Sequence, residues 1–304
     1  ATFPSDTISG HFIWYWGAVH LKNWGVLDQV LESGCPKITK MSSHFGDFML
    51  TGDVSSVDGV PFAVAPRRTV LDKILIDAAR ESGAEVREGF VVDKLIIEDG
   101  VVRGIEGREQ GGKVVREMAK IVVGADGKNS RIAKAVQAES YHEVPPLTCW
   151  YMSYWSGFAC EGIELHWLPN RVVLTVPTND GLTLHAVAWT HSEFHTFRDN
   201  IEQNYTDTLL SMPGLSERIS VSKRETPFVG TADVGSFLRK PYGDGWALVG
   251  DAGHFKDPTP AYGISDAFCD AQLLADAVDA GFSGISSMQD ALTQYEIKRN
   301  ERAI

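Results

Sequence analysis

The sequence lacks long hydrophobic runs and has few cysteines. No stretch of about 18 apolar residues occurs in the 304 residues, so the sequence predicts no membrane-spanning helix. The four cysteines are scattered, without Cys-x-x-Cys spacing or a partner histidine: Cys35, Cys149, Cys160 and Cys269. This pattern argues against a disulfide framework and against a zinc site. We therefore expect reduced thiols, no bound metal and a cytoplasmic location.

Basic residues are also fewer than acidic ones. The chain holds 28 Lys and Arg against 40 Asp and Glu, a formal net charge of −12. Because phosphate backbones are bound through surplus positive charge, nucleic-acid binding is disfavoured as the main role. Residues 1–6 carry no basic segment leading into an apolar one, so nothing marks a secretory signal. An enzyme acting on a small molecule is the expectation, and its oligomeric state is not indicated.

Hydrophobic periodicity predicts several helices. The helix over residues 69–82 is the most regular, with apolar side chains at helical spacing and Gly83 at the C-cap position. A helix also begins after Ser130, a good capping residue. The other expected helices span about 21–33, 193–212, 263–278 and 287–304.

Strand patterns occupy the remaining segments. Short strands are expected over 37–65 and 84–88, and a β-meander over 90–124. The meander ends in the apolar residues 121–123, typical of a strand buried on both faces of a parallel sheet, and residues 246–249 form a second strand of this kind.

The predicted fold is therefore α/β, with a parallel sheet and an inserted antiparallel sheet. Strand-like runs dominate residues 145–235, where the composition shifts. We expect a discontinuous first domain made of 1–36, 66–144 and 236–304. The second domain combines 37–65 with 145–235.

Two strand-to-loop junctions carry the candidate chemistry. Each buried strand delivers a Gly and an Asp to the sheet edge: Gly124 with Asp126, and Gly250 with Asp251. Open α/β sheets bind ligands at this edge, where glycine admits a ligand and a carboxylate accepts hydrogen bonds from sugar hydroxyls. A Gly-Asp pair alone is usually a turn, but the helix entered at Gly263 would direct its N–H groups at a negatively charged ligand.

These segments resemble the FAD-dependent oxidoreductase superfamily of aromatic-ring hydroxylases, geranylgeranyl reductases and flavin-dependent halogenases. Residues 123–131 are similar to its "DG" motif and residues 248–271 to its "GD" motif. Residues 66–71 resemble its Arg-x-x-Leu element, and residues 3–9 the segment after its second sheet strand. The order and spacing of all four agree over nearly the whole chain.

The resemblance implies where FAD binds. Asp251 would contact the ribitol or pyrophosphate region, Arg68 the phosphate–ribityl region, and Asp126 with Gly127 the pyrophosphate side. The implied cofactor-binding residues are Arg68, Asp126, Gly127, Gly250, Asp251, Pro258, Gly263, Ile264 and Ser265, the last four lying along the isoalloxazine ring. Ser265 stands where the superfamily has Asn, and Ala261 replaces a frequent Gly.

One superfamily element is not found in this sequence. The Gly-x-Gly-x-x-Gly turn occurs nowhere, and residues 243–245 fail at its third glycine. The βαβ unit that carries this turn is roughly 30 residues long. We therefore expect the sequence to be part of a longer protein, or a truncated form with impaired flavin binding.

The aromatic run 150–155 has two interpretations. Alternation on a strand would place Trp150, Met152 and Tyr154 on one face. They would form either the core of the inserted sheet or one wall of a pocket for a flat apolar substrate. His254 is either a proton donor or a hydrogen-bonding residue at the helix entry. His191 and His195 suit a structural or surface role, because the metalloprotease pattern requires Glu directly after the first His.

The implied activity is FAD-dependent hydroxylation of an aromatic or polycyclic small molecule with NAD(P)H and O₂. A flavin-dependent reductase or halogenase is the alternative, although the halogenase Trp-x-Trp-x-Ile-Pro stretch and catalytic Lys are not apparent. A non-catalytic fragment that binds a hydrophobic ligand without FAD is a third possibility. The sequence indicates no catalytic residue.

Overall fold

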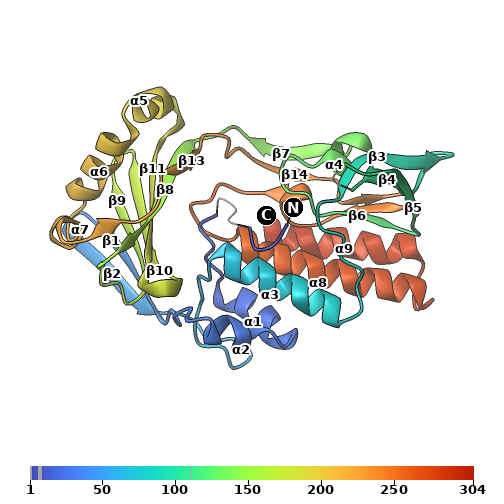
Figure 1. Cartoon of the computed structure of the whole chain (residues 1–304), viewed down its shortest axis with the longest axis horizontal. Coiled ribbons are helices and arrows are strands. Elements are labelled where there is room, and N and C mark those ends of the chain that lie inside the picture. Colours follow the sequence, from blue (N-terminus) through green and yellow to red (C-terminus); the bar gives the residue numbers. More distant parts are fainter. Residues whose placement is uncertain (1, 6–8, 110) are drawn as a thin grey trace.

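The computed structural model describes residues 2–5, 9–109 and 111–304. Residues 6–8 of the segment 3–9 that resembles the FAD superfamily lie outside the described residues. A large curved sheet forms one half of the molecule, and layers of helices and small sheets form the other (Figure 1). None of the described helices combines the length and apolar character needed to cross a membrane.

Eight strands of the described chain form the large sheet, in the order β12-β8-β11-β10-β9-β1-β2 with β13 paired to β8. Their bounds are β1 Lys40–Phe45, β2 Phe48–Asp53, β8 Thr148–Ser156, β9 Ile163–Leu168, β10 Arg171–Pro177, β11 Thr183–Thr190, β12 Lys223–Arg224 and β13 Val229–Thr231. The expectation of an antiparallel sheet holds for every pair except β1 and β9, which run parallel. The exception arises because β1 comes from a distant part of the chain rather than from a hairpin.

The two faces of this sheet pack against different layers. Helices α5 (Phe194–Asp199), α6 (Ile201–Ser211) and α7 (Ser216–Ser220) cover one face. There Tyr151 packs on Phe197, with ring centroids 4.8 Å apart. Trp150 lies in the core on the opposite face. The strand alternation expected for residues 150–155 is therefore confirmed, and the predicted helix over 193–212 is two helices.

The predicted parallel sheet is one short pair of strands. Strand β6 (Val122–Gly124) runs parallel to β16 (Trp246–Leu248), and β15 (Tyr242–Gly243) is antiparallel to β16. All three residues of β16 are buried, as expected. The expectation that β6 is buried on both faces is wrong, because Val123 is 43% exposed. Within the described chain β6 lies at one edge of this sheet, next to β16.

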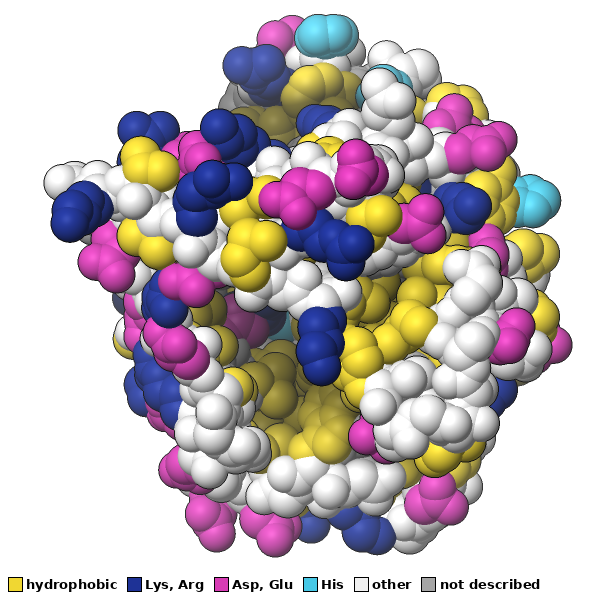
Figure 2. All heavy atoms as spheres, turned by 90° about the vertical axis from the view of Figure 1, so that its right-hand side faces the viewer, with side chains coloured by type: hydrophobic (Ala, Val, Ile, Leu, Met, Phe, Trp, Pro, Cys, Tyr) yellow, Lys and Arg dark blue, Asp and Glu magenta, His cyan; other side chains and the backbone are white. Residues whose placement is uncertain are grey.

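The expected meander is confirmed for three strands, β3 (Val91–Glu98), β4 (Val101–Arg108) and β5 (Val114–Met118). Strand β6 follows them in sequence but pairs in the other sheet. Figure 2 views the molecule from this end, where hydrophobic side chains lie inside a hollow. A third small sheet, β17-β14-β7, consists of β17 (His254–Phe255), β14 (Ser236–Arg239) and β7 (Ser140–Val144).

The other helices of the described chain are α1 Tyr15–Asn23, α2 Leu27–Glu32, α3 Arg68–Glu81, α4 Arg131–Ala135, α8 Gly263–Phe282 and α9 Met288–Ala303, with short 3₁₀ turns η1 Asn179–Gly181, η2 His191–Glu193 and η3 Gly250–Ala252. Helices α3, α4, α8 and α9 lie close to their predicted positions, whereas α1 begins before its predicted start. Ser130 caps α4, its hydroxyl accepting from the Ala133 N–H. The helix expected over 21–33 is interrupted, because Gly25 adopts a φ of 75° between α1 and α2.

The strand expected over residues 84–88 is wrong. This exposed segment has no neighbouring strand to pair with in the described chain. Its contact with the N-terminal residues goes through a side chain instead, since the Phe3 N–H donates to the Glu88 carboxylate at 2.7 Å. A β-pattern without a partner strand leaves the backbone to water.

Candidate functional site

A cavity of about 740 Å³ lies where the two halves meet. Its walls come from the carboxyl ends of β6 and β16, the first turns of α3 and α8, and one face of the large sheet. Nine of the predicted cofactor-binding and substrate-pocket residues line this cavity: Arg68, Gly127, Trp150, Met152, Gly250, Asp251, Pro258, Gly263 and Ile264.

The two strand-to-loop junctions converge on this cavity. Gly124 pairs with Leu248 across the parallel strands, and the Val249 N–H donates to the Gly124 carbonyl at 3.0 Å. The loops that follow, around Gly127 and Asp251, therefore leave the same sheet edge and both line the cavity. This is the position at which open α/β sheets bind ligands.

Three glycines leave bare backbone facing the cavity. Gly10, Gly127 and Gly263 line it, and a Cβ added to any of them would meet no protein atom within 4 Å. A side chain there would project into open space, whereas glycine lets a ligand reach the backbone. Gly250 serves packing instead: its φ is 55°, and a Cβ would approach the Ala267 Cβ to 3.1 Å.

Two predicted cofactor residues point elsewhere. The Asp126 carboxylate accepts from the backbone N–H groups of Arg131 and Ile132, at 2.7 and 3.3 Å. It therefore caps α4. Ser265 is fully buried, and its hydroxyl accepts from the backbone N–H of Trp14 at 3.0 Å. This hydrogen bond joins α8 to the start of α1. Neither residue lines the cavity of the described structure.

Tyr154 also lies behind the cavity wall rather than on it. Its ring stacks on His11 with centroids 5.6 Å apart, and the Arg67 guanidinium lies 4.4 Å from the ring centroid. His11 does line the cavity and is almost fully buried, with a φ of 37°. Sequence reasoning missed His11, because its place depends on a contact across 143 residues of chain.

Arg68 and Asp251 set much of the polar character of the cavity. Arg68 makes a bidentate ion pair with Asp72, at 2.7 and 2.9 Å, one turn along α3. Burial raises the pKa of Asp251, although the nearby cations His254, Arg68 and Lys128 partly counter that rise. A guanidinium with further N–H donors near a half-buried carboxyl suits recognition of a polar, anionic ligand.

A buried cluster of charges fixes the loop around η3. The Nδ1 atom of His254 lies 3.1 Å from Asp270, and its Nε2 lies 3.5 Å from Asp266. Burial alone would lower the pKa of His254, but these two carboxylates outweigh it and raise the pKa to about 9. His254 is thus a fixed cation at neutral pH, which favours the helix-entry role over proton donation. Asp270 also accepts from the Gly250 N–H at 3.1 Å.

Helix α9 supports the same loop with two residues that sequence reasoning missed. The Tyr295 hydroxyl donates to the Leu248 carbonyl at 2.7 Å, and Arg299 donates to the Gly253 carbonyl at 3.3 Å. Arg299 is fully buried. The available signal was the spacing of Tyr295 and Arg299, four residues apart and hence on one helix face.

A smaller apolar chamber of about 400 Å³ adjoins the cavity. Leu174 and Ala261 line both spaces. Four aromatic rings contribute to the chamber walls: Trp14, Phe45, Trp167 and Tyr262. None of the described residues that line it is charged. The chamber therefore suits a flat, neutral, apolar molecule.

Sequence comparison relates the chain to flavoproteins. A family model described as "FAD binding domain" matches residues 20–304. A 1H-pyrrole-2-carbonyl-(peptidyl-carrier protein) chlorinase of Pseudomonas fluorescens is 24% identical over 242 residues, 75% of this chain and 53% of that protein. A kynurenine 3-monooxygenase of Xanthomonas oryzae pv. oryzae is 27% identical over 262 residues, 78% of this chain and 54% of that protein. The chain thus spans about half the length of these relatives.

Structural comparison identifies the same fold. The myxobacterial chondrochloren halogenase CndH superposes with a TM-score of 0.90 at 21% identity, covering 98% of this chain and 71% of that one. PqsL of Pseudomonas aeruginosa, described as a probable FAD-dependent monooxygenase, gives a TM-score of 0.81 at 19% identity, covering 96% and 81%.

Proposed function

Because the chain belongs to the FAD binding domain family of FAD-dependent oxidoreductases, we propose that it is a monooxygenase. The proposed reaction is hydroxylation of an aromatic or polycyclic small molecule with NAD(P)H and O₂. When bound, FAD supplies the redox chemistry, and the protein supplies position and exclusion of water. The main support for this proposal is the chamber, because it is an apolar, aromatic-lined space beside the cavity and suits an aromatic substrate.

The cavity fits FAD in size and in the groups it offers. Its volume of about 740 Å³ falls within the usual range of ligand sites, roughly 300 to 1,000 Å³. Backbone is open to a ligand at Gly127 and Gly263. We assign Arg68 to the phosphate–ribityl region and Asp251 to the ribitol or pyrophosphate region.

The start of α8 is assigned to the isoalloxazine ring. Pro258, Gly263 and Ile264, just before and at the start of α8, all line the cavity. The free N–H groups of this 20-residue helix begin at Gly263 and favour negative charge on a ligand placed there. Ser265 and Asp126 contribute through the backbone that they hold rather than by direct contact.

The substrate is assigned to the chamber and to the part of the cavity next to it. Trp150 and Met152 project from β8 into the cavity, and Leu174 lies where the two spaces join. Apolar walls hold a flat substrate by burial, and they exclude water from the reacting groups.

In the first experiment the purified protein is incubated with FAD, unbound FAD is removed by gel filtration, and the visible absorption of the protein fraction is recorded. We expect bound-flavin bands in the wild type and their loss in Asp251→Ala. The control is Asp207→Ala, an exposed carboxylate on α6, which should keep the bands. A wild type that leaves the gel-filtration column colourless would overturn the proposal and favour a flavin-free ligand-binding role.

The second experiment identifies the reaction. Oxygen uptake with NADH or NADPH is followed with a panel of phenols and polycyclic aromatics, in the presence and absence of bromide. A hydroxylated product supports the proposal. A halogenated product, or a reduced product formed without oxygen uptake, would assign the chain to the halogenase or reductase alternative instead.

A further inference from the structure

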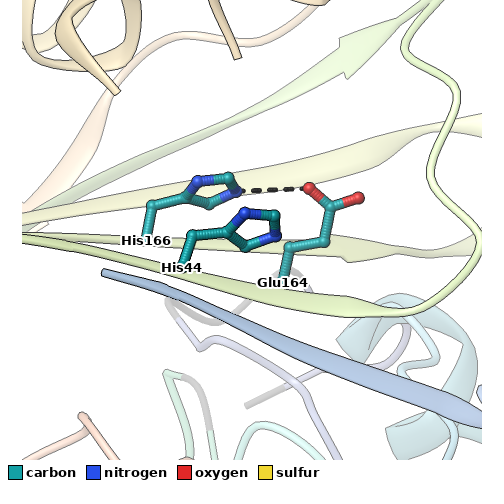
Figure 3. A group of neighbouring side chains, drawn as sticks. All are labelled: His44, Glu164 and His166. Carbon is teal, nitrogen blue, oxygen red and sulfur yellow. Dashed lines mark hydrogen bonds and ion pairs between the residues drawn. The ribbon is translucent and has the colours of Figure 1, made fainter. Parts of the chain in front are cut away.

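A second group of polar side chains lies on the other face of the large sheet. In the parallel pair β1–β9, His44 is in register with His166, and Ser42 with Glu164. Because side chains alternate along a strand, His44, Glu164 and His166 share one face. The opposite face carries Phe45 and Trp167, which line the chamber. Figure 3 shows the two imidazoles and the carboxylate side by side.

The three side chains are close enough to share one ion. Taking one ligand atom from each, all three atoms lie within 4.8 Å of one another. The imidazole centroids of His44 and His166 are 4.2 Å apart, and His166 Nε2 lies 3.2 Å from Glu164. His166 is 1% exposed, and within the described structure its Nδ1 has no hydrogen-bond partner. His44 is only half-buried, which leaves a route from solvent.

Two imidazoles and one carboxylate form a ligand set that zinc and similar divalent metals accept. We propose that His44, Glu164 and His166 bind a divalent transition-metal ion of the zinc class, with water completing its coordination. The two histidine rings are stacked at 12°, so the half-buried His44 must turn to direct a nitrogen lone pair at the ion. Such an ion would link β1 to β9. It would have a structural role and no part in the proposed flavin reaction.

The main competitor for the ion is Arg218 of α7. Its guanidinium binds both oxygens of Glu164 at 2.8 Å and lies over the Phe158 ring. A carboxylate has about four lone-pair positions. On Oε2 they are taken by Arg218 and by His166 Nε2, so a metal bound there replaces the His166 contact, whereas Oε1 accepts only one N–H in the described structure, from Arg218. The positive guanidinium still repels a cation nearby. This geometry predicts that removing Arg218 strengthens metal binding, whereas a site without metal affinity would gain nothing.

The test is calorimetric titration of the purified protein with Zn²⁺ at neutral pH in a buffer that does not bind zinc. We expect one site in the wild type. His44→Ala should weaken binding by at least about 100-fold, since loss of even a supporting group costs 10- to 100-fold. Arg218→Met should strengthen binding by about tenfold, because it removes a positive charge next to the ion. His44→Gln preserves side-chain size should the alanine variant fold poorly.

The matched control removes a different histidine pair. His191 and His195 are exposed and four residues apart, so they test whether any surface histidine pair could account for the binding. The double variant His191→Ala/His195→Ala should bind Zn²⁺ like the wild type. Binding that survives in both His44 variants, or that disappears in the double variant, would overturn the proposal, as would the absence of any binding. Because the titration needs no flavin, its outcome is independent of the proposed oxidoreductase activity.

Discussion

On one side of the cavity the loop around η3 is fixed by ionised groups, whereas on the other side β8, β10 and β11 present mainly hydrocarbon. The first wall holds His254 between Asp266 and Asp270, with Arg299 behind it. The second wall is built from residues such as Leu174, which is 4% exposed. The stability of the first wall should therefore depend on the protonation of its side chains, and that of the second wall on the volume of its side chains.

This division matches what each wall is proposed to do. Directional hydrogen bonds and charges hold backbone positions for a polar cofactor, because each buried group requires its partner in place. Apolar packing is non-directional and tolerates substrates of differing outline. Substitutions on the two walls should therefore differ in their dependence on pH.

The largest expected effect is at Arg299. Arg299→Met would leave the Gly253 carbonyl, the Tyr141 hydroxyl and the Asn300 amide oxygen without this donor in a buried region. We expect a loss of about 4 kcal/mol in the free energy of unfolding. Urea denaturation measures it, with Lys298→Met, an exposed neighbour on α9, as the control. Equal losses in both variants would refute a specific role for the buried arginine.

The next effect concerns the pH dependence of stability. The pKa of His254 rises from 6.5 to about 9 in the folded protein, so protonated His254 stabilises the fold. That contribution is complete below pH 6.5 and is lost as the pH rises through 9. At 1.36 kcal/mol per pKa unit, it amounts to about 3 kcal/mol.

Urea denaturation of Asp270→Asn between pH 6.5 and 9.5 isolates this contribution. Loss of the nearer carboxylate should flatten the fall in stability, because the pKa of His254 returns toward its ordinary value. Asp276→Asn, an exposed position on α8, should retain the wild-type profile. A profile for Asp270→Asn as steep as that of the wild type would show that the ion pair does not stabilise the loop.

A smaller effect is expected on the apolar wall. Leu174→Ala should cost about 2 kcal/mol, near the lower end for a buried leucine, because Leu174 already borders two cavities. The loss should be the same at pH 6.5 and pH 9, since no titratable group is removed. A loss of stability that changed with pH would contradict the proposed difference between the two walls.

Short-range patterns made much of the fold predictable. The strand-to-loop junctions, the start of α8 at Gly263 and the Ser130 cap each depend on a few consecutive residues. The convergence of Gly127 and Asp251 on one cavity follows from those patterns through the general rule for parallel strands.

Long-range contacts explain what the sequence did not show. The parallel pairing of β1 with β9 joins segments more than a hundred residues apart, and no local signal specifies it. The same pairing brings Phe45 and Trp167 together in the chamber and sets His44 beside His166. Arg299 was missed because charged residues are seldom fully buried, so its place on a helix suggested solvent.

At Asp126 the local structure and the family resemblance point to different roles. Its carboxylate caps α4, so we expect Asp126→Ala to lower the unfolding free energy by about 1 kcal/mol. Asp126→Asn keeps an acceptor oxygen and should lose less. Calorimetric titration with FAD should show little change in affinity for either variant, unlike Asp251→Ala. If Asp126→Ala instead lost FAD while remaining as stable as the wild type, the carboxylate would turn toward the cofactor, and the polar wall would extend to the end of β6.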